Sequence, residues 1–211
     1  MVDFAGALTP PPTHAPDTVR EQLRELHTRR AQLVAMRADE LKCQEQPGLG
    51  KVAAASLRRT SAGLTREITK LEVAADQLVD QSPALHHFRA VLLTTQGVGA
   101  LTATAATLPE LGQVSRQRIA SLAGLAPFVY HSGQYKGQAH IRGGRLAVRQ
   151  ALYMAALSAM RCNPSLKPFA QRLTARGKPC HVVITAVMRK LLRHLNADLH
   201  RHPFVPLKTT Q

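Results

Sequence analysis

The second half of this 211-residue chain has almost no carboxylates. Twelve of the thirteen Asp and Glu residues lie at or before Glu110, and the only later one is Asp198. A serine that attacks a carbonyl usually needs a carboxylate behind its histidine, so that chemistry is disfavoured in this half. Because no carboxylate lies between Glu110 and Asp198, any metal site there would have to use histidine or cysteine. Hard cations such as Mg²⁺, which prefer carboxylate oxygens, are disfavoured in this segment.

Cysteines are few, and long apolar runs are missing. Cys43, Cys162 and Cys180 are widely spaced and form no C-x-x-C pair, which argues against zinc and disulfide frameworks and indicates reduced intracellular thiols. No stretch is long and apolar enough to span a bilayer, and the N-terminus lacks the basic and apolar regions of a signal peptide. We therefore expect a cytoplasmic protein that does not associate with membranes.

Positive charge is the dominant feature of what is present. The chain has a formal net charge of +15 and a pI near 10.9. Fourteen Lys or Arg residues lie between Glu110 and Asp198, where no acid can balance them. Such a segment needs a polyanion or counterions, and phosphate-bearing nucleic acid is the natural partner.

The first third of the chain has the periodicity of a helical hairpin. Residues 1–16 form a proline-containing linker or tail, after which Asp17 can cap a helix that ends at "QPGLG". The next helix carries a heptad repeat. Its leucines are Leu57, Leu64, Leu71 and Leu78, and the companion positions are Ala54, Ser61, Ile68 and Ala75. We predict an antiparallel coiled-coil hairpin over residues 17–81, which acts as a spacer or forms a homo-oligomer.

Residues 82–199 are predicted to form a compact helical domain, so that the fold class is all-α. "TTQGVGA" lies between two apolar stretches, and Gly97 and Gly99 there permit a helix-hairpin-helix turn whose N–H groups bind phosphate. A plain helical turn is the alternative. The helix after Arg116 is expected to end at Pro127, and a small β-hairpin is the only strand structure expected, near residues 128 to 142. Later helices are expected to end at Gly177 and near Leu199, before a loose tail over 200–211. The last helix is predicted to place Val187, Leu191 and Leu195 on its apolar face, opposite Arg189, Lys190 and Arg193.

The candidate functional residues cluster in "YHSGQYKGQAHIRGGR", residues 130–145. Ser132 stands there among cations, a setting that suits attack on a phosphate. Four cations are candidates for contacts with that phosphate: Lys136, Arg142, Arg145 and Arg149. The three arginines are spaced by three and four residues and are predicted to share one helical face. General backbone binding is the alternative role for them, and an ordinary loop hydroxyl is the alternative for the serine.

Histidine and tyrosine offer competing chemistry. His131 is adjacent to Ser132, but neighbours in an extended segment point to opposite faces, so we do not expect it to be a base on that serine. His140 is equally open to a phosphate contact. A tyrosine nucleophile could come from Tyr130, Tyr135 or Tyr153. We place Tyr153 on a buried face of its helix, which disfavours this alternative.

Several separated motifs together carry a resemblance to a known family. They are "LAGLAP", "HSG", "GGRLAVRQALYMAAL", "NPSLKPFAQRLTARGKP" and "AVMRKLLRHLNA". In this order they resemble the C-terminal transposase domain of the insertion-sequence 110 family of DNA recombinases, from about Ser82 to Leu199. The upstream hairpin is similar to that family's coiled-coil segment. The resemblance implies that Ser132 is the nucleophile of DNA transposition, forming a phosphoserine link to a strand end, and that a structured bridge RNA guides the protein.

The resemblance also implies a metal-binding domain that this sequence does not contain. Family members carry an N-terminal ribonuclease-H-like, resolvase-like domain whose four acidic residues hold magnesium. Asp3, before a proline linker, is no substitute for it. We therefore expect a truncated copy with no cofactor of its own, for which Mg²⁺ enters only with the acidic domain.

Two functions remain open. One is a serine-dependent DNA recombinase domain that works with an acidic partner domain; the other is a non-catalytic remnant that binds nucleic acid. The genomic sequence upstream of Met1 would separate them, because an open frame encoding an acidic domain favours the first.

Overall fold

The structure is a computed structural model that describes residues 17–99, 108–128, 131–132, 135–136 and 140–205. Within these ranges the chain forms seven helices and two very short antiparallel strand pairs. The predicted all-α class is therefore confirmed. The N-terminal segment 1–16, predicted as a linker or tail, lies outside the described residues.

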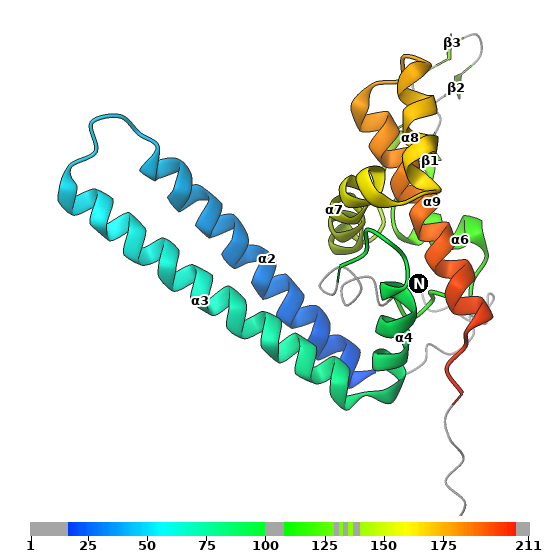
Figure 1. The fold of residues 1–211 in the computed structure, drawn as a ribbon, viewed down its shortest axis with the longest axis horizontal. Helices are drawn as coiled ribbons and strands as arrows, with labels where there is room; N and C mark the ends of the chain where they lie inside the picture. Colours follow the sequence, from blue (N-terminus) through cyan, green and yellow to red (C-terminus); the bar gives the residue numbers. More distant parts are fainter. Residues whose placement is uncertain (1–16, 100–107, 129–130, 133–134, 137–139, 206–211) are drawn as a thin grey trace, which may run out of the picture.

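The two longest helices form an arm that extends away from the rest of the molecule (Figure 1). Helix α2 spans Thr18–Gln44 and α3 spans Lys51–Gln81. They run antiparallel, side by side, and are joined by residues 45–50. Asp17 caps α2 as predicted: its carboxylate accepts a hydrogen bond of 3.1 Å from the Val19 backbone N–H.

The buried seam of the arm lies mainly on the companion positions of the heptad and less on its leucines. Four residues of α3 are buried: Ser61, Ile68, Ala75 and Val79. The four heptad leucines are only half-buried. Small side chains let the two helices approach closely, and the leucines then flank the contact. A true coiled-coil supercoil stays a prediction.

Helix α4, Pro83–Leu93, joins the arm to the remaining helices. Ser82 caps it, and Leu85 packs in a small core with Leu23, Ala75 and Val79 of the arm. Arg89 of α4 also pairs with Asp76, at 3.0 Å, and with Asp80 of α3. The angle of the arm is thus fixed at its base by apolar packing and by ion pairs.

Helix α6, Arg116–Leu122, is shorter than predicted. We expected Pro127 to end it, but the chain leaves the helix at Gly124, which has φ of 69°. The Gly124 N–H donates to the Ser121 carbonyl, at 2.9 Å, and the Leu125 N–H donates to the Ala120 carbonyl, at 2.8 Å. These two bonds are the glycine-dependent helix ending known as the Schellman motif, which stops the helix before the proline is reached.

The glycine-rich segment contains the predicted small β-hairpin. Strand β1, Pro127–Phe128, pairs with β4, His140–Ile141. Further out, β2, His131–Ser132, pairs with β3, Tyr135–Lys136. Both pairs are antiparallel, and in the sequence β2 and β3 lie between β1 and β4, so the second pair is nested within the first.

Three more helices complete the compact part of the molecule. We call this part the bundle, and it consists of α6 to α9 and the segment 108–115. Helix α7 spans Leu146–Cys162, α8 spans Leu166–Ala175 and α9 spans Cys180–Arg201. Helix α9 is central, since α4, α6, α7 and α8 all pack against it. Its residues Val187, Leu191 and Leu195 are fully buried, as the apolar stripe predicted. Helix α8 ends before Gly177, also as predicted.

The C-terminal segment is ordered further than we expected. We predicted a loose tail from residue 200, but α9 continues to Arg201. Beyond it, the His202 carbonyl oxygen lies 2.9 Å from Nε2 of His87 in α4, and the rings of His87 and Phe204 contact each other. Residues 206–211 of that tail lie outside the described range. No helix in the described part of the chain is long and apolar enough to cross a membrane.

Candidate nucleic-acid interface

Ser132 lies in the outer part of the β-hairpin. It is the last residue of β2, and its Cα is in register with that of Tyr135 in β3. Lys136 is the other residue of β3 and pairs with His131. The side chains of Ser132 and Lys136, and Gly133 between the strands, lie outside what the structure describes. The backbone thus places the predicted nucleophile near the end of a short two-stranded projection, in the last residue pair before residues 133–134.

The base of this hairpin is held by a close contact between two glycine-containing loops. Gly124, after α6, and Gly144, before α7, both have φ of 69°. A Cβ on Gly144 would overlap the backbone N and Cα of Gly124, so no larger residue fits there without a backbone shift. The Arg145 N–H also donates to the Leu122 carbonyl, at 3.0 Å. The hairpin is therefore fastened to the end of α6 and the beginning of α7.

Two of the arginines that were predicted to contact phosphate help to hold the base of the hairpin in place. The Arg149 guanidinium donates to the Gly143 carbonyl at 2.6 Å. Arg145 makes a bidentate ion pair with Glu110, with N–O distances of 2.7 and 2.6 Å. The hydrogen bond from Arg145 is the main cause that lowers the pKa of Glu110 below its usual value. Both arginines thus have structural roles in this fold.

The predicted shared face of the three arginines is wrong. Helix α7 begins at Leu146, Arg145 is its extended N-cap residue, and Arg142 lies in the segment before it. Only Arg149 is within the helix. The glycines at 143 and 144, both with positive φ, interrupt the helical spacing that the pattern assumed.

The Gly97 turn is also built into the core. Gly97 has φ of 97°, and a Cβ there would lie 2.7 Å from the Ala159 Cα in α7. The Asn163 side chain donates to the Gln96 carbonyl at 3.0 Å, which ties the end of α7 to the same turn. The second helix of the predicted helix-hairpin-helix falls on residues 100–107, outside the described range. Phosphate binding by Gly97 and Gly99 stays a prediction.

Tyr153 is exposed, so the prediction that it lies on a buried face of its helix is wrong. We placed it on a buried face of α7, but 44 % of its surface is accessible, while Leu152 and Ala156 face the core. Burial is therefore no reason to reject a tyrosine nucleophile at this position. The side chains of Tyr130 and Tyr135 lie outside the described part of the structure.

An arginine-lined hollow lies between α6 and α9. Its volume is about 270 Å³, and it is lined by Arg116 and Gln117 of α6 and by Arg189 and Arg193 of α9. Among the residues that the structure describes, the three guanidinium groups have no ion-pair or hydrogen-bond partner. Lys190, next to Arg189 in sequence, instead lies over the Phe169 ring, 4.5 Å from its centroid. The sequence had placed Arg189 and Arg193 on the polar face of their helix, but Arg116 comes to them only through the fold.

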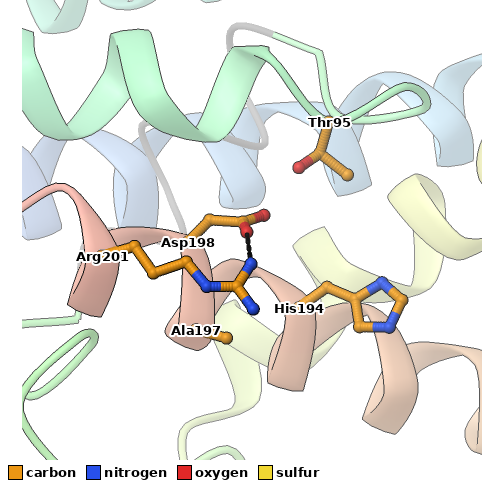
Figure 2. A pocket seen from close by; sticks show the side chains of 5 residues that line it. All are labelled: Thr95, His194, Ala197, Asp198 and Arg201. Carbon is orange, nitrogen blue, oxygen red and sulfur yellow. Dashed lines mark ion pairs between the residues drawn. The ribbon is translucent and has the colours of Figure 1, made fainter.

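A second hollow, of about 280 Å³, balances its own charge (Figure 2). Asp198 and Arg201 form an ion pair of 3.5 Å on one side of it, and Thr95, His194 and Ala197 line the rest. Burial is the main cause that lowers the pKa of His194, with Lys190 the next largest cause. The two hollows therefore differ in charge: an ion pair occupies the rim of one, and only cations and an amide line the other.

The described residues do not fit a magnesium ion. They contain no group of three or more His, Cys, Asp and Glu side chains close enough to share a metal. Cys43, Cys162 and Cys180 are free thiols on the surface. What this arrangement can do chemically is bind anions, through guanidinium groups and through the cationic surroundings of the hairpin.

Comparisons with known proteins show a family and several relatives to which the chain is similar. Residues 89–171 match the family model described as Transposase IS116/IS110/IS902 family. The chain is 33% identical over 136 residues to the "Pilin gene-inverting protein" of Moraxella bovis, which covers 59% of this chain and 41% of that protein. It is 29% identical over 160 residues to the "Insertion element IS900 uncharacterized 42 kDa protein" of Mycobacterium paratuberculosis, covering 71% of this chain and 40% of that protein.

The chain thus spans about two-fifths of the length of the curated relatives that it matches. The matched family segment runs from α4 to α8 and includes Ser132, the hairpin and Arg116 of the arginine-lined hollow. Over residues 89–171 this chain is similar to the transposases of the IS116/IS110/IS902 family.

Proposed function

We propose that this chain takes part in DNA transposition or site-specific recombination, with Ser132 as the nucleophile. The observation that carries the proposal is the family match over residues 89–171, because that segment contains Ser132 and the loops that hold its hairpin. The name of the Moraxella relatives, which describes inversion of a gene, supports strand exchange on DNA. The net charge of +15 supports a phosphate-bearing substrate.

The proposed reaction exchanges one phosphate ester for another. The Ser132 hydroxyl oxygen attacks the phosphorus of a DNA backbone phosphate and loses its proton. A new O–P bond to serine forms, the P–O bond to one strand end breaks, and the released strand end takes up a proton as a hydroxyl. Attack by another strand end's hydroxyl reverses these steps and frees the serine. No nucleotide cofactor is required, since the number of phosphate ester bonds is unchanged.

Cations near the hairpin would stabilise the charge that builds up on the phosphoryl oxygens. Lys136 and Arg142 are the candidates in the hairpin segment, and Arg145 and Arg149, which hold the loops at its base, are candidates close to them. Gly97 and Gly99 are candidates for backbone contacts to phosphate at a second place. The magnesium-dependent part of the reaction is assigned to an acidic domain, in the same polypeptide or supplied in trans. A guide RNA and self-association through the arm belong to the same proposal.

A covalent-adduct assay tests the nucleophile. The chain is combined with the acidic domain of a family member, Mg²⁺ and a nicked duplex that traps the intermediate, and the protein–DNA adduct is mapped by mass spectrometry. We expect the adduct on the peptide containing Ser132, its loss in Ser132→Ala, and its persistence in Ser158→Ala, which removes an exposed serine of α7. An adduct that remains in Ser132→Ala or maps to Tyr153 would refute the proposal.

A non-catalytic role is the competing function. The arginine-lined hollow favours it, because that site can bind nucleic acid without any reaction at Ser132. DNA binding with no adduct under the same conditions would support this second function.

A further inference from the structure

We infer that the hollow between α6 and α9 is a binding site for the phosphate backbone of duplex DNA. The inference rests on the proposed function and names a place on the chain where its substrate is held. It concerns Arg116, Gln117, Arg189 and Arg193, which the sequence analysis did not select as site residues. The site is separate from Ser132 in sequence and lies on different secondary-structure elements.

The charges that line the hollow have no partner within the described residues. Arg145 and Arg149 have acceptors in the loops that hold the hairpin. The guanidinium groups of Arg116, Arg189 and Arg193 have none. Arg189 and Arg193 are four residues apart on α9, so they share one helical face, and like charges at this spacing weaken a helix. An anion bound among the three arginines would remove this unfavourable energy.

The size and the donors of the hollow suit a phosphate group. The hollow is about 270 Å³, roughly nine times the volume of about 30 Å³ that a water molecule occupies in the liquid, which leaves room for a hydrated phosphate group. Planar guanidinium groups bind phosphate oxygens through paired hydrogen bonds. Gln117 adds an amide donor at the same rim.

The lining of the hollow suits duplex nucleic acid better than single strands. Sites for unpaired bases combine cations with aromatic side chains on which the bases stack. The residues that line this hollow are three arginines and a glutamine, with no aromatic ring among them. Such a lining contacts the backbone and does not read bases, which matches a duplex held without sequence selection.

The test compares two triple variants of the full chain that remove the same charge. One is Arg116→Gln, Arg189→Gln and Arg193→Gln. The control is Arg24→Gln, Arg58→Gln and Arg59→Gln, which removes three exposed arginines from the arm. Affinity for a mixed-sequence 30-base-pair DNA is measured across a range of salt concentrations. Circular dichroism and thermal melting check both folds, and glutamine is a good helix former at each helical position.

We expect the hollow variant to bind DNA about tenfold more weakly, with a salt slope smaller by about 0.9 for each phosphate that it no longer neutralises. The arm variant should keep nearly the full slope. Equal weakening in the two variants, or full affinity in the hollow variant, would overturn the site. Weaker binding to an RNA duplex of the same length, with DNA binding unchanged, would overturn the assignment to DNA.

This result is separable from that of the covalent-adduct assay. A chain that needs the hollow for DNA binding but forms no Ser132 adduct refutes the proposed function and keeps the site. A chain that forms the adduct but binds DNA equally well without the three arginines refutes the site and keeps the function.

Discussion

The arm and the bundle treat charge in different ways. In the arm, basic side chains meet acidic ones: Arg30 pairs with Glu72 across the two helices at 2.7 Å, and Lys70 pairs with Glu67 at 2.8 Å. In the bundle, the described residues contain two acidic partners, Glu110 and Asp198, and most cations have neither. The arm therefore balances its charge internally, whereas the bundle keeps an excess of positive charge.

The difference teaches that net charge alone does not locate an interface. A value of +15 describes the whole chain, but surface ion pairs already neutralise much of the arm. Some cations of the bundle already have contacts within it: Arg145 and Arg149 hold loops, and Lys190 lies over the Phe169 ring. The positive charge left without a contact is therefore confined to fewer residues. What remains unpartnered in the described bundle includes the three arginines of the hollow.

The largest effect that separates the two regions is expected from their cores. Leu191→Ala should lower the free energy of unfolding by about 2–5 kcal/mol, because this fully buried side chain lies in the centre of α9. Met36→Ala in the arm, where half of the side-chain surface is exposed, should cost less than about 1 kcal/mol. Chemical denaturation measures both, and similar decreases would mean that the bundle core is not the main source of stability.

A smaller effect is expected where the hairpin is fastened to the bundle. Gly143→Ala and Gly144→Ala both place a side chain at positive φ, which costs about 1–2 kcal/mol. Only the Cβ of Gly144→Ala would also overlap the Gly124 backbone, since nothing lies within 4 Å of a Cβ at Gly143. Gly144→Ala should therefore destabilise the protein more and reduce adduct formation. Equal melting temperatures for the two variants would contradict the close contact between the loops.

Removing one acidic charge from the bundle and one from the arm should change DNA binding differently in the two regions, with little change in stability. Glu110→Gln breaks a partly exposed ion pair and should cost about 0–1 kcal/mol. It also frees Arg145, so DNA affinity and its salt slope should both rise. Glu67→Gln breaks a similar pair in the arm and should leave the slope nearly unchanged. An equal rise in both variants would show that the two regions contribute alike.

A modest pH effect is expected from the arm. Burial, and next Arg30, lower the pKa of His27 below 6.5, and Asp76 offsets this only in part. The unfolded state then binds more protons, so His27 should reduce stability as the pH falls through 6.5, with no further decrease below its folded pKa. His27→Gln should weaken the dependence of the melting temperature on pH between 7.5 and 5.5. An unchanged dependence would mean that the pKa of His27 is the same in the folded and unfolded states.

Features that are determined by residues close together in the sequence were predicted well, and features that need contacts between distant residues were not. The capped start of α2, its end before Gly48, and the buried stripe of α9 follow from local patterns, and all three were predicted correctly. The small hairpin was also predicted, because its glycines and alternating residues are local signals.

The features that were missed depend on contacts between distant residues. The Glu110–Arg145 pair joins residues 35 positions apart, and the glycine contact of 124 with 144 joins two loops. The hollow needs α6 and α9 to pack together. Tyr153 was misplaced because α7 is apolar on more than one face, so periodicity did not show which face meets the core. No single-sequence signal would have placed these residues.

The most direct measurement of the central claim is where DNA contacts the chain. Duplex DNA with photoreactive groups on its backbone is cross-linked to the full chain, and the attached peptides are identified by mass spectrometry. We predict that cross-links concentrate on the peptides containing Arg116, Arg189 and Arg193 and on the Ser132 hairpin. Cross-links that fall mainly on α2 and α3 would contradict the account, because the arm and not the bundle would then be the nucleic-acid interface.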